Sequence, residues 1–437
     1  MRLTTLLAVA VCVSAQAADY VPETWNQEAR QRFAEQRFGI FIHWGLYATF
    51  AQGEWYQQQK PIDPETYART MDGFCPSKFD AREWVRVFKR AGAKYLTVTS
   101  RHHDGFSLWP TKADDGYNVS NTPFRRDILG ELATACREEG LQLNFYYSLM
   151  DWHRKDYPAG SAANRVLGAQ KGDYPSYKKF MMAQIAELID LYRPGCIWFD
   201  GEWEHATHQA DGTWQRTLDW EFDDIYDLIH ARKTLVANNN HQPIRPKEDI
   251  QLFERDLPGE NADAGFSAHQ PVAKDRPIEQ CDVLQHDVWG YRIGAAFRSP
   301  EEVVAMVARA AAKGSNLLMN IGPDGSGRLP GQAVEVMARV GAWFDRNGES
   351  IYGTQAGGVS LGKSVVSTRK GDTIYLHFLD PAVNKIAFSL TGDVVSATCL
   401  GSGSPVRVER TASGDAVVTV ARPAGDAFDL VAKVVVK

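Results

Sequence analysis

The sequence lacks the features by which metal, nucleic-acid and membrane partners are usually recognised. Its six cysteines in 437 residues include no CxxC pair of the kind that holds zinc. An HxH pair and an HExxH motif are also absent. The 54 acidic residues slightly outnumber the 48 basic ones, and no basic run occurs. These absences argue against a metal cofactor and against a nucleic-acid or anionic-membrane partner.

One apolar run stands at the amino terminus, and it is too short to cross a bilayer. Arg2 gives a positive start, Leu3–Val13 is apolar, and Ala15–Ala17 has the small residues of a cleavage site. We therefore expect residues 1–17 to be a signal peptide and the mature chain to be exported, to the periplasm or outside the cell, without inserting into a membrane. Cys12 leaves a lipoprotein signal open. The five cysteines that follow it are odd in number and widely spaced, which does not indicate a disulfide framework.

The rest of the chain is long enough for one large α/β domain and a small second domain. Over residues 18–352, short apolar runs alternate with amphipathic stretches, which predicts a (β/α)8 barrel. The expected strands are Phe38–Trp44, Tyr95–Ser100, Leu141–Tyr147, Cys196–Phe199, Leu235–Asn238, Ile250–Phe253, Asp282–Gln285 and Asn316–Ile321. The expected helices are Ala81–Ala91, Ile128–Glu139, Tyr177–Leu191, Phe222–Ala231, Glu301–Ala312 and Gln332–Asn347. The segment between residues 238 and 250 has no room for a helix and residues 255–280 read as loop, so we expect an irregular barrel that lacks one or two outer helices.

The pattern changes after Tyr352. Glycine-rich turns then separate short alternating strands, which predicts a small antiparallel β-sandwich over residues 353–437. The expected strands are Thr373–Phe378, Lys385–Leu390, Val394–Cys399, Val406–Thr411, Ala416–Val420 and Asp429–Val435. This domain could bind a glycan or only pack against the barrel.

Polar side chains gather where the predicted barrel strands end, which is where such barrels build their active sites. They are His43, His102, His103, Asp104, Tyr146, Tyr147, Asp151, Asp200, Asn238 to His241, Glu254 and Asn320, flanked by Trp44, Trp55, Trp109, Trp152, Trp198 and Trp289. Two carboxylates among aromatic walls suit acid/base or nucleophilic work on a sugar. Each motif also has a plainer interpretation: Asp200 as a cap of the next segment, Glu254 as the ion-pair partner of Arg255, and the tryptophans as core.

The histidines leave a metal-dependent hydrolase open as an alternative. His43, His102 and His103 lie at two strand ends and could together hold an ion. However, adjacent strand residues such as His102 and His103 should point to opposite faces, which argues against a shared ion.

Several motifs, taken in order, resemble those of glycoside hydrolase family 29, the α-L-fucosidases. They are FGIFIHWGLY with His43, EWY with Glu54, AKYLTVTSRHHDGFSLW, YYS followed by DW, IWFDG, SNLLMNIGPDGSG and NGESIYGT, and they cover nearly the whole mature chain. The resemblance implies a retaining exo-glycosidase that removes terminal α-L-fucose from oligosaccharides or glycoconjugates without a cofactor or metal.

The resemblance also implies roles for individual residues. Asp200 would be the nucleophile and Glu254 the acid/base, with Glu260 and Glu279 as fallbacks for the latter. The sugar would be held by His43, Glu54, Trp55, His102, His103, Trp198, Trp289 and one of Tyr146 and Tyr147, of which we favour Tyr147. For retention the two carboxyl groups should lie about 5–5.5 Å apart, with Glu254 protonated by a raised pKa and Asp200 ionised.

One segment departs from the family pattern. Family members commonly carry an Arg after the fifth strand, where this chain has Asn238–His241. Either Arg245 substitutes from the loop, or an Asn or His replaces the contact. The departure leaves open the same chemistry on an α-L-galactoside. The choice of Glu254 as acid/base leaves open a catalytically inactive glycan-binding relative. The sequence does not indicate the linkage, the aglycone or the oligomeric state.

Overall fold

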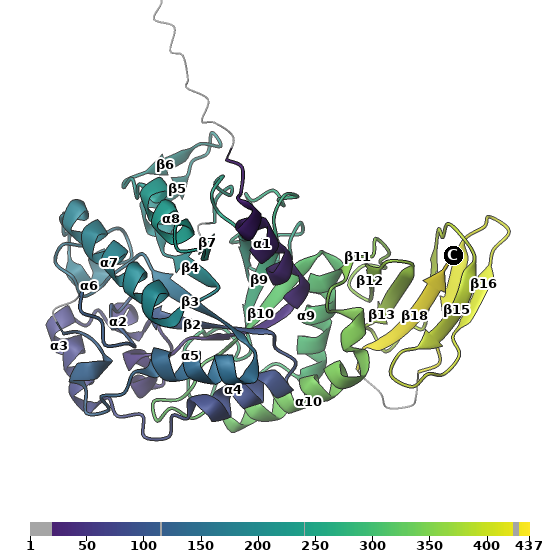
Figure 1. Ribbon diagram of the computed structural model, residues 1–437, viewed down its shortest axis with the longest axis horizontal. Coiled ribbons are helices and arrows are strands. Elements are labelled where there is room, and N and C mark those ends of the chain that lie inside the picture. The colour runs from purple at the N-terminus through teal and green to yellow at the C-terminus, as the bar shows by residue number, and fades with distance from the viewer. Residues whose placement is uncertain (1–19, 114–115, 240, 423–427) are drawn as a thin grey trace, which may run out of the picture.

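The structure is a computed structural model that describes residues 20–113, 116–239, 241–422 and 428–437. The predicted signal peptide, residues 1–17, lies outside these residues. A parallel barrel forms the larger part of the molecule, and antiparallel sheets built from the carboxyl-terminal residues lie beside it (Figure 1).

Eight parallel strands form the barrel sheet, and they follow one another around it in chain order. Neighbouring strands pair in parallel, and β10 pairs with β1. The ring closes between β7 and β8 through a single parallel bridge, Ala237 to Ile250. This is the predicted (β/α)8 architecture. The strands are β1 (Phe38–Ile42), β2 (Tyr95–Arg101), β3 (Gln142–Ser148), β4 (Cys196–Asp200), β7 (Leu235–Asn239), β8 (Gln251–Glu254), β9 (Ile278–Val283) and β10 (Ser315–Ile321).

Side-chain caps begin several of the outer helices. The side chain of Asp80 accepts a hydrogen bond from the backbone of α4, and Asp127 does the same for α5. Ser299 and Glu302 form a capping box at the start of α9. The outer helices are α4 (Ala81–Arg90), α5 (Ile128–Glu139), α7 (Tyr174–Tyr192), α8 (Phe222–His230), α9 (Pro300–Ala312) and α10 (Gly331–Asn347).

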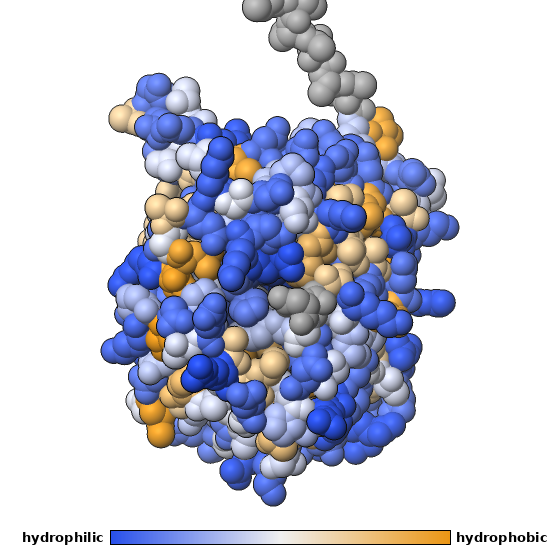
Figure 2. Space-filling view, turned by 90° about the vertical axis from the view of Figure 1, so that its left-hand side faces the viewer, coloured by the Kyte–Doolittle hydropathy of each residue, from blue (hydrophilic) through white to orange (hydrophobic). Residues whose placement is uncertain are grey.

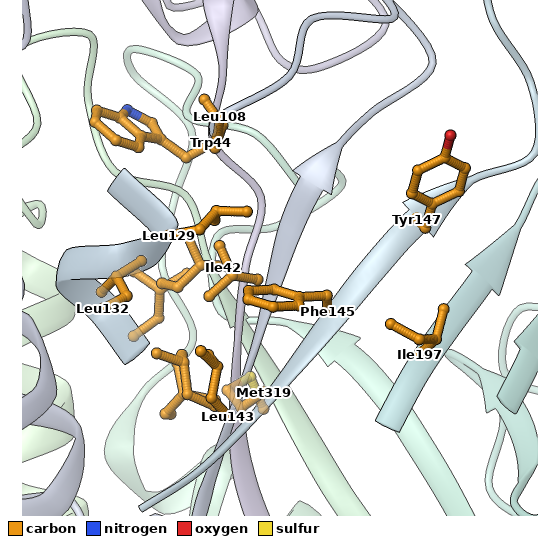
Figure 3. Packing of buried hydrophobic residues seen from close by; sticks show 14 of the residues in the cluster. Ile42, Trp44, Leu108, Leu129, Leu132, Leu143, Phe145, Tyr147, Ile197 and Met319 are labelled. Carbon is orange, nitrogen blue, oxygen red and sulfur yellow. The ribbon is translucent and has the colours of Figure 1, made fainter. Parts of the chain in front are cut away.

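Apolar side chains fill the space between the strands and these helices. In Figure 3, Leu143, Phe145 and Tyr147 project from the same face of β3, and Leu129 and Leu132 of α5 lie near the first two. This face of β3 is therefore the outer one, so the alternate residues of β3 face the barrel interior.

The irregularity predicted for the barrel is present. Among the described residues, no helix lies between β7 and β8 or between β8 and β9. An additional helix that the sequence did not predict, α1 (Thr24–Gln36), precedes β1. Its Phe33 packs on Tyr95, the first residue of β2, and its Arg30 pairs with Asp249 before β8. Helix α1 therefore covers the amino-terminal end of the barrel, opposite the expected active site.

The strand expected at Asp282–Gln285 was misplaced, since β9 spans Ile278–Val283. Its polar residues concealed it, because Glu279 and Asp282 break the apolar run. Glu279 is nonetheless buried inside the barrel, where Tyr95 and Trp198 donate hydrogen bonds to its carboxylate at 2.5 and 3.0 Å.

Loops at the carboxyl-terminal end of the barrel carry short elements. They are α2 (Tyr56–Gln59), α3 (Pro64–Ala68), α6 (Asn164–Leu167) and the hairpin of β5 (Ala206–His208) and β6 (Trp214–Arg216). Figure 2 views the molecule from the side on which α3 and α6 lie in Figure 1. That face is mostly hydrophilic, with small scattered apolar patches.

The carboxyl-terminal region is an antiparallel sandwich, as predicted. One sheet has the order β11-β12-β13-β18-β15 and the other β14-β17-β16. Apolar residues of both sheets, such as Leu376 and Val418, share one core. The strands are β11 (Gln355–Ala356), β12 (Val365–Lys370), β13 (Thr373–Phe378), β14 (Lys385–Phe388), β15 (Val394–Cys399), β16 (Arg407–Arg410), β17 (Ala416–Thr419) and β18 (Leu430–Val436). Strands β11 and β12 were not predicted.

Within the described residues, no helix is both long enough and apolar enough to cross a membrane.

Candidate active site

A pocket of about 430 Å³ opens at the carboxyl-terminal ends of the barrel strands. It collects nine of the ten predicted site residues: His43, Glu54, Trp55, His102, His103, Trp198, Asp200, Glu254 and Trp289. Phe41, Tyr146, Trp203, Asn239, His241, Arg255, Phe266, Cys281 and Asp287 complete its lining. Residues from β1, β2, β3, β4, β7, β8 and β9 and the loops after them thus meet in one cavity.

Asp200 and Glu254 face each other across the side-chain amide of Asn239. The Asn239 Nδ2 donates to Asp200 Oδ1 at 3.2 Å and to Glu254 Oε2 at 2.7 Å. Because both hydrogen bonds share the Asn239 Nδ2 atom, the two bonded carboxylate oxygens are at most about 6 Å apart. Inverting glycosidases hold their carboxyl groups roughly 6.5–9.5 Å apart. The two bonded oxygens therefore lie closer together than the carboxyl groups of inverting enzymes.

Three donors hold the Asp200 carboxylate. Besides Asn239, the Tyr146 hydroxyl donates to Oδ2 at 2.8 Å and the Trp203 indole donates to Oδ1 at 3.0 Å. The ring of His103 lies farther away, with Nε2 at 3.5 Å from Oδ2. Burial and the nearby charge of Glu254 nevertheless raise the pKa of Asp200 to about 6.

Glu254 lies beside His241, which stabilises the negative charge of its carboxylate. Burial acts to raise the pKa of Glu254, but the hydrogen bond and the charge of His241, 2.9 Å away, outweigh it, so this pKa lies below its usual value. Asp200, with a pKa of about 6, is ionised at neutral pH as expected, but the expectation of a raised pKa at Glu254 is wrong. The reason is the position of His241, which the sequence did not reveal.

The three predicted histidines are buried around the pocket and uncharged. Burial lowers the pKa of His43 to about 3 and lowers those of His102 and His103 well below the usual value. His43 Nδ1 is 2.7 Å from Asn320 Oδ1, and His103 Nδ1 is 2.7 Å from Ser148 Oγ. The Nδ1 of His102 has no hydrogen-bond partner among the described residues. Neutral imidazoles can both donate to and accept from sugar hydroxyls.

Both His102 and His103 face the pocket, with ring centroids 4.0 Å apart. The expectation that they point to opposite faces does not hold, because β2 ends at Arg101 and the alternation of strand residues ends with it. Within the described part of the chain, no three His, Cys, Asp or Glu side chains are grouped so that they could hold a metal ion.

Aromatic rings wall the pocket. Phe41 meets Trp198 and Trp289 edge to face at centroid distances of 5.2 and 6.0 Å, which makes an apolar corner. Trp55 lies edge-on to His103 and stacks on Trp203 at 5.9 Å. Such rings offer flat apolar faces to the C–H faces of a sugar.

Glu54 fixes the loop that carries Trp289. Its Oε2 accepts hydrogen bonds from the backbone nitrogens of Trp289 at 3.1 Å and of Gly290 at 2.7 Å. Asn320 donates to the Trp289 carbonyl at 2.6 Å. The predicted site residue Glu54 therefore lines the pocket and also positions one of its walls.

Tyr147 does not belong to the site. Its hydroxyl donates to Gln184 at 2.8 Å behind the barrel, and its side chain projects with the outward-facing residues of β3 (Figure 3). Strand β3 begins at Gln142, so Tyr146, not Tyr147, points inward. The tyrosine of the pocket is Tyr146, the other residue of the pair named from the sequence.

The fallback residues for the acid/base lie elsewhere. Glu260 is on the surface, 3.3 Å from Lys313. Glu279 is buried beneath Trp198, where burial raises its pKa to about 7. Arg245, which could have replaced the family's Arg, pairs with Glu202 and Glu248. It lines a separate hollow of about 1040 Å³ that contains no predicted site residue. Asn239 and His241 occupy the pocket instead.

Sequence reasoning missed Trp203 and Phe266. Trp203 lies three residues after Asp200, in the motif IWFDGEW, and a search for aromatic residues just beyond the strand ends would have found it. Phe266 lies in a long loop that carries no periodic pattern. It is 44% exposed, and its ring lies parallel to that of His241 at the mouth of the pocket.

Comparison with known proteins gives consistent matches. The sequence pattern of the family described as alpha-L-fucosidase matches residues 7–349. Tissue alpha-L-fucosidase of Homo sapiens is 28% identical over 416 residues, which span 87% of this chain and 84% of the human protein. Alpha-L-fucosidase isoenzyme 1 from Paenibacillus thiaminolyticus superposes with a TM-score of 0.81 at 32% identity, over 95% of this chain and 100% of that one. A covalent intermediate of a family 29 alpha-L-fucosidase from Bacteroides thetaiotaomicron, trapped with 2-fluoro-fucosyl fluoride, superposes with a TM-score of 0.79 at 25% identity, over 97% and 98%.

Proposed function

The chain belongs to the alpha-L-fucosidase family of glycoside hydrolases, and we propose that it releases terminal α-L-fucose from glycans with retention of configuration, through a covalent fucosyl–Asp200 intermediate. The bridge from Asn239 to both carboxylates carries this proposal. It holds the bonded oxygens of the attacking carboxylate and the proton donor within about 6 Å of each other, which supports a retaining reaction. The trapped covalent intermediate of the Bacteroides relative supports the same two-step course.

In the first step, an oxygen of Asp200 attacks the anomeric carbon while the glycosidic bond breaks. Glu254 delivers a proton to the departing oxygen, so the aglycone leaves as a neutral alcohol. In the second step, Glu254 takes a proton from water, whose oxygen attacks the anomeric carbon and displaces Asp200. Both carboxylates then carry the charges with which they began.

The donors around Asp200 serve this cycle. Tyr146, Trp203 and Asn239 each offer one hydrogen to the carboxylate. They stabilise its charge before the attack and the leaving carboxylate after it. The neutral histidines suit the sugar hydroxyls, and the apolar corner of Phe41, Trp198 and Trp289 suits the C5 methyl group of fucose.

The direct test is turnover of 4-nitrophenyl α-L-fucoside by the wild type, Asp200→Ala and Glu254→Gln. We expect the wild type to be active and Asp200→Ala to lose at least about 1,000-fold in kcat/KM, because the nucleophile is gone. Azide should partly restore turnover in Asp200→Ala and yield the β-fucosyl azide. Glu260→Gln is the matched control, because Glu260 is an exposed Glu on a neighbouring loop.

The stereochemistry decides the reaction class. Proton NMR of the first product should show α-L-fucose, which then equilibrates in water. Initial release of the β-anomer would mean inversion, and it would remove Asp200 from the role of nucleophile.

We further propose that the enzyme works outside the cytoplasm, in the periplasm or beyond it. The positive start, apolar run and Ala15–Ala17 site of the first seventeen residues support this. Amino-terminal sequencing of the mature protein after expression in a bacterium should begin at Ala18. A cytoplasmic product that still starts at Met1 would contradict export.

A further inference from the structure

His241 forms the closest charged contact to Glu254. It lies in the loop after β7, with its Nε2 2.9 Å from Glu254 Oε2. The backbone of His241 has a φ of 56°, in the left-handed region that few non-glycine residues adopt. The ring of Phe266 lies parallel over the imidazole at 5.4 Å. The side chains of His241 and Glu254 are only 19% and 14% exposed, so water screens their contact little.

Among the described residues, the groups around this pair do not supply another cation at contact distance. The charged or titratable groups that face it are His43 from the loop after β1, Glu54 from the same loop, Asp200 from β4, Arg255 and Asp256 from the loop after β8, and Asp287 from the loop after β9. His43 is uncharged, since its pKa is about 3. Arg255 turns to Asp287, 3.4 Å away. Tyr146 and Cys281 stay protonated, because burial raises their pKa values far above neutrality.

We propose that His241 stores the proton that Glu254 delivers to the leaving group. The inference rests on the proposed function, because it assigns Glu254 as the acid. His241 contacts Glu254, so in this role it is a positioning residue that acts through the carboxylate.

The proton balance is closed within the pair. Before reaction, one proton is held between His241 Nε2 and Glu254 Oε2. As the glycosidic bond breaks, the pair loses that proton to the departing oxygen through Glu254, which leaves a neutral imidazole beside a carboxylate. When water attacks the intermediate, its proton returns to the pair. No other donor or acceptor is required.

The contact between His241 and Glu254 determines which of the two neighbouring carboxylates carries the proton. With one proton shared between Asp200 and Glu254 alone, occupation of Asp200 would block the attack. Burial lowers the affinity of His241 for a proton, yet the contact with Glu254 outweighs it, so the pKa of His241 is raised. The imidazole of His241 is therefore a third proton-binding group, next to Glu254, that keeps the proton close to the leaving group while Asp200 is ionised.

The test compares His241→Gln and His241→Arg with the wild type across pH. Gln keeps a donor near Glu254 but holds no transferable proton, and Arg keeps a cation that does not release one. In His241→Arg the alkaline limb of kcat/KM should move to lower pH by about one unit or more, because the retained cation keeps the pKa of Glu254 low and a carboxyl proton is lost at lower pH than an imidazole proton. In His241→Gln the shift should be smaller, because burial then acts on the pKa of Glu254 without a cation to oppose it. At neutral pH, turnover of 4-nitrophenyl α-L-fucoside should fall by about 10–100-fold.

A second substrate separates proton supply from structural damage. 2,4-Dinitrophenyl α-L-fucoside needs little protonation, so the deficit of both variants should shrink by at least about tenfold on it. A deficit that is equal for both substrates and constant across pH would overturn the proposal. His230→Gln is the matched control, because His230 Nε2 also contacts a carboxylate, that of Asp249, at 2.9 Å on the outside of the barrel. That control should keep the wild-type pH profile.

The titration of His241 itself gives a readout that does not depend on turnover. NMR of the 15N-labelled imidazole should show His241 titrating at lower pH in Glu254→Gln than in the wild type. An unchanged titration would overturn the proposal even if the His241 variants were inactive or unstable. Failure of the wild type to hydrolyse any fucoside would instead contradict the proposed function, and it would leave this titration as the independent test of the pair.

Discussion

Tyr146 and Tyr147 are neighbours in the chain, yet their hydroxyls serve opposite faces of β3. The Tyr146 hydroxyl donates to Asp200 Oδ2 at 2.8 Å, and the Tyr147 hydroxyl donates to Gln184 at the same distance. One bond lies in the pocket and the other lies between the barrel and helix α7. Replacing either tyrosine by Phe removes one hydroxyl, so the same chemical change should have different consequences at the two positions.

Tyr146→Phe should lower kcat/KM for 4-nitrophenyl α-L-fucoside by about 10–100-fold, because a hydrogen bond to a charged group is lost. Tyr147→Phe should leave kcat/KM within about twofold of the wild type and lower the free energy of unfolding by about 1–2 kcal/mol, since Gln184 loses its donor. Steady-state kinetics and urea unfolding of both variants measure the two effects. A larger kinetic defect in Tyr147→Phe than in Tyr146→Phe would contradict the assignment of Tyr146 to the site.

The pKa of Asp200 sets the acid side of the activity profile. Because the pKa of Asp200 is raised to about 6, the carboxyl is protonated below that pH and cannot attack. kcat/KM, which reports the free enzyme, should rise as the pH increases through about 6. A profile that is flat from pH 4 to 6 would show that Asp200 ionises at its ordinary pKa. The measurement requires only the wild type and a set of buffers of constant ionic strength.

The barrel was predictable because its elements carry strong local signals. Helix α5 has the predicted bounds, since Asp127 caps its start and Gly140 ends it with a φ of 73°. Strand β9 was displaced because its buried Glu279 is polar, and burial of a polar residue depends on partners that come from β2 and β4. Sequence alone reports local preference and does not reveal such distant partners.

The residues that line the pocket were largely predictable, but the orientation of individual side chains and their pKa values were not. Nine of the ten predicted site residues line the pocket, because parallel strands bring their carboxyl-terminal ends together at one edge of the barrel. The choice between Tyr146 and Tyr147 depends on where β3 begins, and period-two alternation does not give that starting point. The lowered pKa of Glu254 depends on His241, whose loop has no repeating pattern.

Asn239→Asp tests the bridge between the two carboxylates. The change keeps the size of the side chain but replaces the donor with a third negative charge between Asp200 and Glu254. The pKa of Asp200 should rise further, so the acid limb of kcat/KM should shift to higher pH, with a loss of at least about 100-fold at pH 6. Asn239→Ser, which keeps a short donor without charge, should lose less. Equal losses in the two variants, with no shift of the limb, would argue against an electrostatic role.

Removal of divalent metals should not change turnover. In the pocket, His43 is hydrogen-bonded to Asn320 and His103 to Ser148, and both imidazoles suit hydrogen bonding to sugar hydroxyls. Activity measured after dialysis against EDTA should equal that of the untreated enzyme. A loss that Zn²⁺ or Mn²⁺ restores would favour the metal-dependent alternative and would require His43, His102 and His103 to move together.

The apolar corner should make the enzyme prefer fucose to L-galactose. The two sugars differ by one hydroxyl on the C5 substituent. The ring of Phe41 lies edge to face with Trp198 and Trp289 at centroid distances of 5.2 and 6.0 Å. A hydroxyl placed against these rings loses its bond to water, and a hydrophobic pocket that must accept an added hydroxyl typically discriminates by about 10–100-fold. The ratio of kcat/KM values for 4-nitrophenyl α-L-fucoside and α-L-galactoside measures this preference. A ratio near one would mean that a polar group, with His241 as the nearest departure from the family pattern, reaches the added hydroxyl, and the natural substrate would then have to be sought among α-L-galactosides.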